Sequence, residues 1–199
     1  MTAALHFRFE SEEHLYIALD TGETLPSITQ MLKSTCWVDD TFFSEDSCDR
    51  GTAVHTLTAD YDLGALHLET CVSPFRGYAL GWAQAARALR AEWSHIEVPM
   101  VHRRYRFGGR PDRIGIVIGG LKTVVEVKSG APTKSHAIQT ALQAVLAADE
   151  GGLPAEHYQR LAVYLKPNGK FSIERFINRR DFDVALDVIR TCCVKREVA

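Results

Sequence analysis

The sequence of 199 residues contains no stretch of about 18 consecutive apolar residues, so we expect no membrane-spanning helix. Its first ten residues do not form a basic segment followed by an apolar one, which predicts that no secretory signal is present. Internal repeats, low-complexity tracts and linkers rich in proline or serine are missing as well. We therefore expect one domain that covers residues 1–199.

Cysteine is also scarce, and its spacing excludes the common metal motifs. No two cysteines are arranged as C-x-x-C, which argues against a zinc ribbon or an iron–sulfur centre and predicts a reduced, cytoplasmic protein. The spacings of a P-loop and of G-x-G-x-x-G are absent too, so a dinucleotide site is not expected. The five cysteines are Cys36, Cys48, Cys71, Cys192 and Cys193.

What the chain does contain is an ordinary globular composition with an uneven distribution of charge. Hydrophobic residues make up 46% and charged residues 24%, values that argue against disorder. The net charge of -2 combines an acidic first part with a basic remainder: residues 1–70 hold 13 acidic and 3 basic residues, and residues 71–199 hold 12 acidic and 20 basic. Such a chain can present a basic face to a polyanion, although uneven solvated charge is the simpler interpretation.

Hydrophobic periodicity predicts an α/β fold, in which a mixed central β-sheet is flanked by helices and preceded by an N-terminal β-hairpin. We expect helices at 26–33, with Ser27 as N-cap, and at 51–61, 75–93, 133–149, stopped by Gly151, and 181–195. The expected strands are the hairpin arms at 5–10 and 14–19 and the segments 96–101, 114–118, 123–128, 160–166 and 171–176.

Three charged residues around the strands at 114–118 and 123–128 have the pattern of a hydrolytic site. Alternation along the second strand places Glu126 and Lys128 on the same face, and Asp112 lies just before the first strand. Two converging carboxylates repel each other unless a divalent cation lies between them, and hard oxygen ligands favour Mg²⁺ or Mn²⁺. A neighbouring lysine can orient the attacking water and offset the charge of a phosphate in transition. The alternative is a set of charged residues on an exposed strand.

Pro111-Asp112, a hairpin, and then Glu126-Val127-Lys128 resemble the signature of the PD-(D/E)XK nucleases. The resemblance implies hydrolysis of DNA phosphodiester bonds, with Asp112 and Glu126 as metal ligands and Lys128 as a catalytic group. The signature by itself is short and degenerate.

Further segments resemble the RecB-like and phage (lambda-type) exonuclease branches of that family. Arg50-Gly-Thr-Ala-Val-His55 is similar to a helical motif whose histidine joins the metal, and Gln139 stands where these branches carry a catalytic glutamine. Gln143 occupies a position at which tyrosine is common, which leaves the role of that position open. Leu25-Pro-Ser-Ile-Thr-Gln-Met-Leu32 is similar to the opening of many phage-type members. The resemblance covers residues from about 25 to 165, and residues 166–199 would add a C-terminal strand and helix.

The resemblance implies an exonuclease of DNA recombination or repair that acts in a bacterial or phage-infected cell, together with a ring-type homo-oligomer and a recombination partner protein. Gln139 would position Lys128 or the substrate. Glu97 is either a ligand of a second metal or an outward-facing strand residue, and the two interpretations have equal weight. An endonuclease or repair nuclease on the same fold remains an alternative, as does a DNA-binding protein without catalysis.

A basic segment leads into Asp112 and predicts contact with DNA. Arginines alternate with aromatic residues there, a composition that suits phosphate contacts and base stacking. The candidates for DNA contact are Arg103, Arg104, Arg106 and Arg110, and Arg113 extends the basic run. The alternative is a charged strand with a solvated face. His95 and His102 match no position of the family, and we expect both at the surface.

Overall fold

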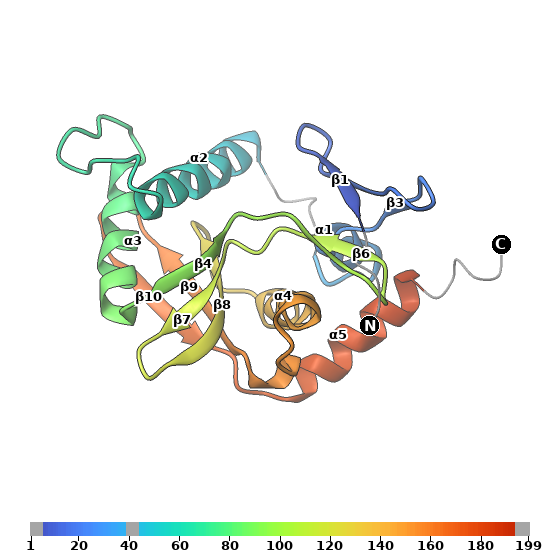
Figure 1. Cartoon of the computed structure of the whole chain (residues 1–199). Helices are drawn as coiled ribbons and strands as arrows, with labels where there is room; N and C mark the ends of the chain where they lie inside the picture. The colour runs from blue at the N-terminus through green and yellow to red at the C-terminus, as the bar shows by residue number, and fades with distance from the viewer. Residues whose placement is uncertain (1–5, 39–43, 194–199) are drawn as a thin grey trace.

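The protein is described by a computed structural model that covers residues 6–38 and 44–193, and Figure 1 shows a central sheet between helices. The sheet has the strand order β10-β9-β8-β7-β4, in which β8 and β9 are parallel and the other neighbours antiparallel. The strands are β4 (Glu92–Ile96), β7 (Arg113–Val117), β8 (Leu121–Lys128), β9 (Gln159–Leu165) and β10 (Phe171–Arg175). The predicted fold class, α/β with a mixed sheet flanked by helices, is confirmed.

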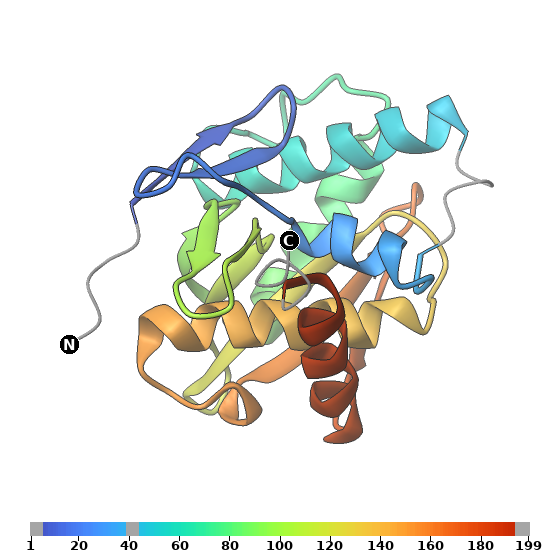
Figure 2. The same ribbon diagram turned by 90° about the vertical axis from the view of Figure 1, so that its right-hand side faces the viewer.

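Helices cover both faces of this sheet. The helix α3 (Arg76–Leu89) lies on one face and α4 (Ser135–Gly151) on the other (Figure 1). The helix α2 (Glu45–Asp62) packs against α3, whereas α1 (Ile28–Ser34) and α5 (Arg180–Cys193) pack against α4, and Figure 2 shows α5 crossing α4. A short 3-10 helix, η1 (Ala155–His157), precedes β9. Within the two described ranges, no helix has the length and apolar character needed to cross a bilayer.

The central strand β8 shows why the sheet is covered on both sides. Val124 is buried among residues of α4 and α5, while Val125 and Val127 are buried among residues of α3 and β9. Strand alternation therefore divides the apolar side chains of β8 between two cores. The same alternation turns Glu126 toward the α4 side, away from Val125 and Val127.

Two smaller antiparallel sheets complete the fold. The expected N-terminal hairpin is present as β1 (Phe7–Glu10) and β2 (Leu15–Ala18), and β2 also pairs with β3 (Thr24–Leu25). The strands β5 (Met100–His102) and β6 (Phe107–Gly109) form a ribbon that the sequence pattern did not predict. Gly108 in this ribbon lies directly beneath the ring of Tyr16, where a side chain at position 108 would collide with that ring.

Ser27 caps α1 as predicted, since its hydroxyl accepts a hydrogen bond from the Gln30 backbone N–H and its own backbone N–H donates to Oε1 of Gln30. The predicted stop of α4 was wrong by one residue: Gly152, rather than Gly151, adopts the left-handed conformation at the C-cap, and α4 begins at Ser135. The helix α2 is longer than predicted because Ser44 caps it upstream of Gly51. The outermost predicted residues, 5 in the hairpin and 194–195 in the last helix, lie outside the described ranges.

The segment between α3 and β6 differs most from the prediction. The helix expected at 75–93 ends at Leu89, because Arg90 adopts a left-handed conformation with φ 47° and ψ 50°. Trp93, expected in that helix, belongs to β4. The strand expected at 96–101 is interrupted by Glu97, whose φ of 52° ends β4. Glu97 is therefore not an alternating strand residue, and the outward orientation inferred for it from alternation was wrong.

Candidate metal centre

A cleft of about 750 Å³ brings the predicted site residues together. Its walls come from the N-terminal sheet and α1 on one side and α2 on another, and α4 and the ends of β7 and β8 form the deeper part. The predicted residues that line it are His55, Glu97, Arg110, Asp112, Glu126, Lys128 and Gln139. The predicted residues that meet in the cleft thus lie up to 84 positions apart in the chain, from His55 to Gln139.

Asp112 is held by the pairing of β7 with β8. Arg113 is the register partner of Val125, so Asp112 lies opposite the next residues of β8. One carboxylate oxygen, Oδ2, accepts a hydrogen bond of 2.6 Å from the backbone N–H of Val127. The other, Oδ1, lies 3.4 Å from Nδ1 of His55. The backbone contact fixes the orientation of the carboxylate and leaves Oδ1 facing the cleft.

Glu126 is buried and accepts hydrogen bonds from three side chains. Its Oε1 accepts from Lys128 Nζ at 2.6 Å and from Gln139 Nε2 at 2.7 Å. Its Oε2 accepts from Nε2 of Gln143. The two glutamines lie one turn apart on α4, so that both face this strand. The position whose role the sequence left open, Gln143, therefore holds the carboxylate of Glu126.

The residues best arranged to hold a metal ion are His55, Glu97 and Asp112. One ligand atom from each lies within 4.8 Å of the others, and His55 Nδ1 is 3.0 Å from Glu97 Oε1. Two carboxylates are hard donors that fit Mg²⁺ or Mn²⁺, and the softer imidazole nitrogen favours Mn²⁺ over Mg²⁺. Glu126, also expected as a ligand, lies outside this three-residue cluster, and its oxygens accept hydrogen bonds from three side chains.

The charges in the cleft perturb one another strongly. Burial, and then the charge of Glu126, raise the pKa of Asp112 to about 7. The charge of Asp112, together with Glu97, outweighs burial and raises the pKa of His55 to about 9. Burial alone would raise the pKa of Glu126, but Lys128 and the other donors lower it. The raised pKa of Asp112 reflects carboxylates crowded together in a buried cleft, a repulsion that a divalent cation between them would relieve.

The fully buried Arg113, which ends the basic run and begins β7, supports this cluster from behind. Its Nη1 donates to the carbonyl oxygen of Asp112 at 2.6 Å and lies 3.6 Å from Glu97 Oε1. Its Nε donates to Asp62 at 2.6 Å, and its guanidinium lies 5.0 Å from the ring centroid of Trp82. Because side chains alternate along a strand, the position of Arg113 directly after Asp112 indicated that the two side chains point to opposite faces of the sheet. Nothing in the local sequence indicated Asp62 as its partner.

Of the arginines predicted to contact DNA, Arg110 alone lines the cleft, with Nε 3.2 Å from Glu97 Oε2. Arg103 pairs with Asp149 at 2.8 Å. Arg104 is exposed and lies over the ring of Tyr105. These three arginines therefore lie in different surroundings and do not share one face of a strand.

Arg106 occupies the turn between β5 and β6, with a φ of 51°, and lies 3.2 Å from Asp20 and 3.0 Å from Glu23. His102, expected at the surface, is buried and stacks on Phe107, so that prediction was wrong. Nδ1 of His102 accepts a hydrogen bond from the backbone N–H of Tyr105 in the turn, and this bond holds the imidazole inside the β5–β6 ribbon.

No family model matches the sequence, and no curated protein matches it. Two solved structures resemble the fold. One is a provisionally named exonuclease from Eubacterium rectale, with 11% identity over 85% of this chain and 72% of that chain and a TM-score of 0.45. The other is SSO0001, with 15% identity over 86% of this chain and 93% of that chain and a TM-score of 0.34. At such scores, neither likeness bears on what the chain does.

Proposed function

We propose that the chain is a metal-dependent nuclease of the PD-(D/E)XK type that hydrolyses DNA phosphodiester bonds. One observation carries the proposal: Asp112, Glu126 and Lys128 converge in a single cleft beside His55 and Glu97. Burial of carboxylates beside a lysine costs desolvation free energy, and ionisable groups with strongly perturbed pKa values cluster at functional sites. The arrangement is accounted for by a phosphate substrate and a cation.

Asp112, Glu97 and His55 would hold the metal, and Glu126 is the fourth proposed ligand. A bound Mg²⁺ or Mn²⁺ supplies charge neutralisation of the phosphate and increases the acidity of a water molecule. The N–H of Val127 holds Oδ2 of Asp112, which would leave Oδ1 available to the ion. Such orientation of a ligand by a neighbouring donor is typical of metal sites.

The remaining side chains of the cleft position charge around the substrate. Lys128, with its side chain 22% exposed, presents its ammonium group to the cleft and would offset charge on the phosphate as the bond breaks. Gln139 and Gln143 hold Glu126 in place. Arg110, at the rim, would contact a neighbouring phosphate of the strand.

Within this class we propose a phage-type exonuclease of recombination or repair, which would assemble as a ring around DNA. An endonuclease uses the same chemistry, and the two are separated by the substrate. An exonuclease digests linear DNA and leaves closed circular DNA intact, whereas an endonuclease cuts both.

The test is incubation of the purified protein with linear and circular DNA in Mg²⁺, in Mn²⁺ and in EDTA. Wild-type protein is expected to cleave in either metal and not in EDTA. Lys128→Ala is expected to lose cleavage. Lys122→Ala is the matched control, because Lys122 lies on the same strand but at its exposed end, outside the cleft. Binding of DNA without cleavage in both metals would favour the non-catalytic alternative, and equal activity of the two variants would refute the assignment of Lys128.

A further inference from the structure

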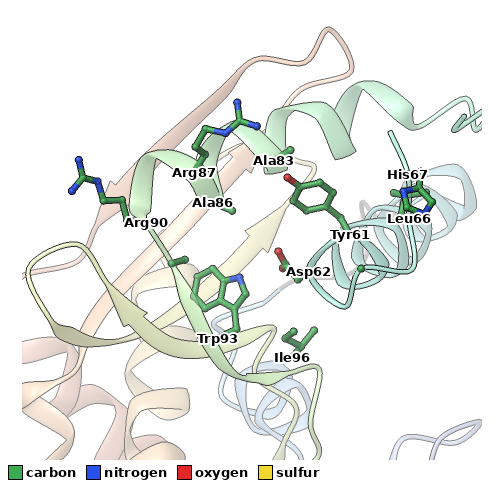
Figure 3. A pocket seen from close by; sticks show the side chains of 12 residues that line it. Tyr61, Asp62, Leu66, His67, Ala83, Ala86, Arg87, Arg90, Trp93 and Ile96 are labelled. Atoms are coloured by element: carbon green, nitrogen blue, oxygen red, sulfur yellow. The ribbon is translucent and has the colours of Figure 1, made fainter. Parts of the chain in front are cut away.

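A second hollow, of about 700 Å³, lies outside the catalytic cleft (Figure 3). It opens between the C-terminal end of α2, the loop that follows it, α3 and β4. It shares no lining residue with the catalytic cleft. Its lining includes Tyr61, Asp62, His67, Arg87, Arg90 and Trp93.

The inner part of this hollow is aromatic. Trp93 is half-buried and stacks on the fully buried Trp82, with ring centroids 5.9 Å apart and an interplanar angle of 19°. Figure 3 shows Tyr61 and Trp93 extending toward each other across the hollow. A ring supported from behind by a second ring keeps its orientation, so Trp93 offers a flat surface on which a planar group can stack.

The rim of the hollow carries unpaired positive charge. Arg87 lies in the last turn of α3, and Arg90 is the C-cap residue that follows this helix. Both side chains are exposed and extend outward from the rim in Figure 3, and neither guanidinium has a hydrogen-bond or ion-pair partner in the part of the chain that the structure describes. His67 lines the hollow from the loop after α2. These groups leave the rim able to accept an anion.

Asp62 is the one acidic residue of the lining, and its charge is already neutralised. Its Oδ2 accepts hydrogen bonds from Arg113 Nε at 2.6 Å and from Trp82 Nε1 at 2.9 Å. The side chain of Asp62 is 4% exposed, so it presents little charge to a ligand. The charge that an incoming molecule meets is therefore that of the arginines.

We propose that this hollow binds a nucleoside phosphate, with its base stacked against Trp93 and its phosphate held by Arg87 and Arg90. A purely apolar ligand would leave the two arginines without a role, and a free phosphate would leave the aromatic surface unused. Stacking on an aromatic side chain and pairing with arginine are the two contacts by which proteins hold nucleotides without reading their sequence. The nucleotide is either a free mononucleotide or one unit of a DNA strand.

The hollow and the catalytic cleft lie on opposite sides of one side chain. Arg113 contacts Asp62, which lines the hollow, and reaches to 3.6 Å from Glu97, which lines the cleft. A strand that leaves the cleft around β4 would therefore meet the hollow close to the metal centre. The binding proposed here needs neither a metal nor cleavage, so it can be tested whether or not the protein proves to be a nuclease.

The experiment is a calorimetric titration in EDTA with dAMP, adenosine and inorganic phosphate. Saturable binding of dAMP is expected, with adenosine and phosphate each weaker by about tenfold or more, since each lacks one of the two contacts. The double variant Arg87→Gln with Arg90→Gln should have an affinity for dAMP about tenfold lower. These exposed positions can change without loss of the fold. Arg110→Gln in the catalytic cleft and Lys166→Gln with Lys170→Gln on the β9–β10 turn are the controls, and both should leave the affinity unchanged.

A short single-stranded DNA then identifies the source of the nucleotide. If the single-stranded DNA displaces dAMP, and if Arg87→Gln with Arg90→Gln also lowers the affinity for this DNA, the hollow holds part of a substrate strand. If dAMP binds and the strand does not compete, the hollow holds a free nucleotide. The proposal is overturned by the absence of saturable dAMP binding, by equal affinity in the Arg87/Arg90 variant, or by loss of affinity in Arg110→Gln, which would place the nucleotide in the catalytic cleft.

Discussion

The buried pair formed by Arg113 and Asp62 leads to a prediction about stability. The side chain of Arg113 is 0% exposed and that of Asp62 is 4% exposed, with 2.6 Å between Nε and Oδ2. Arg113→Met removes the cation and leaves the carboxylate of Asp62 buried with only neutral donors, the indoles of Trp82 and Trp93. Breaking a buried pair by removing one partner costs about 3–5 kcal/mol of unfolding free energy, and we expect a loss in that range.

Removal of both charges should lower the free energy of unfolding less than removal of Arg113 alone. In Arg113→Met with Asp62→Leu no unpaired charge stays buried, so the double variant should be more stable than Arg113→Met alone. Urea unfolding followed by circular dichroism measures both. Arg190→Met is the control, because the exposed pair of Arg190 with Asp187 should contribute less than about 1 kcal/mol.

Two results would refute this reasoning. A loss below about 1 kcal/mol in Arg113→Met would mean that water or a rearranged donor compensates Asp62. A double variant less stable than the single one would mean that Asp62 serves mainly as the acceptor for Trp82 and not as the counterion of Arg113.

Four further predictions concern the cleft and its surroundings. Lys128→Ala should slow DNA cleavage by about 100-fold or more in a gel assay, whereas Lys122→Ala should cleave as wild type does. His55→Ala should weaken Mn²⁺ binding in calorimetry and reduce manganese-supported cleavage more than magnesium-supported cleavage, and unchanged Mn²⁺ affinity would remove His55 from the site. Arg110→Gln should lower the slope of log DNA affinity against log salt by about 0.7–0.9 in Ca²⁺, and an unaltered slope would place the DNA path elsewhere. Burial lowers the pKa of His136 to about 4, so the unfolded chain takes up a proton first and the unfolding free energy should fall as the pH decreases from 6.5 toward 4. His136→Gln should reduce the steepness of this fall in urea titrations at several pH values, and an unchanged steepness would contradict the assignment to His136.

Much of the site followed from local patterns in the sequence. The alternation of β8 placed Glu126 and Lys128 on one face and their valine neighbours on the other, because a strand reverses its side chains at every residue. The same rule, applied to the hairpin of β7 and β8, brought Asp112 to the end of the strand that carries Glu126. Ser27 capped α1 for an equally local reason, since its hydroxyl serves a backbone N–H three residues ahead.

Packing between distant elements decided the rest. Glu97 lies beside His55 because its positive φ ends β4 and turns the chain into the cleft. Hydrophobic periodicity does not predict such a change of backbone conformation. Gln143 reaches Glu126, and Arg113 reaches Asp62, only because α4 and α2 settle at particular distances from the sheet. A sequence pattern indicates the face of the strand on which a charged side chain lies. The tertiary structure determines which residue that side chain pairs with, because ionic and hydrogen-bond energies depend on separations of a few ångströms.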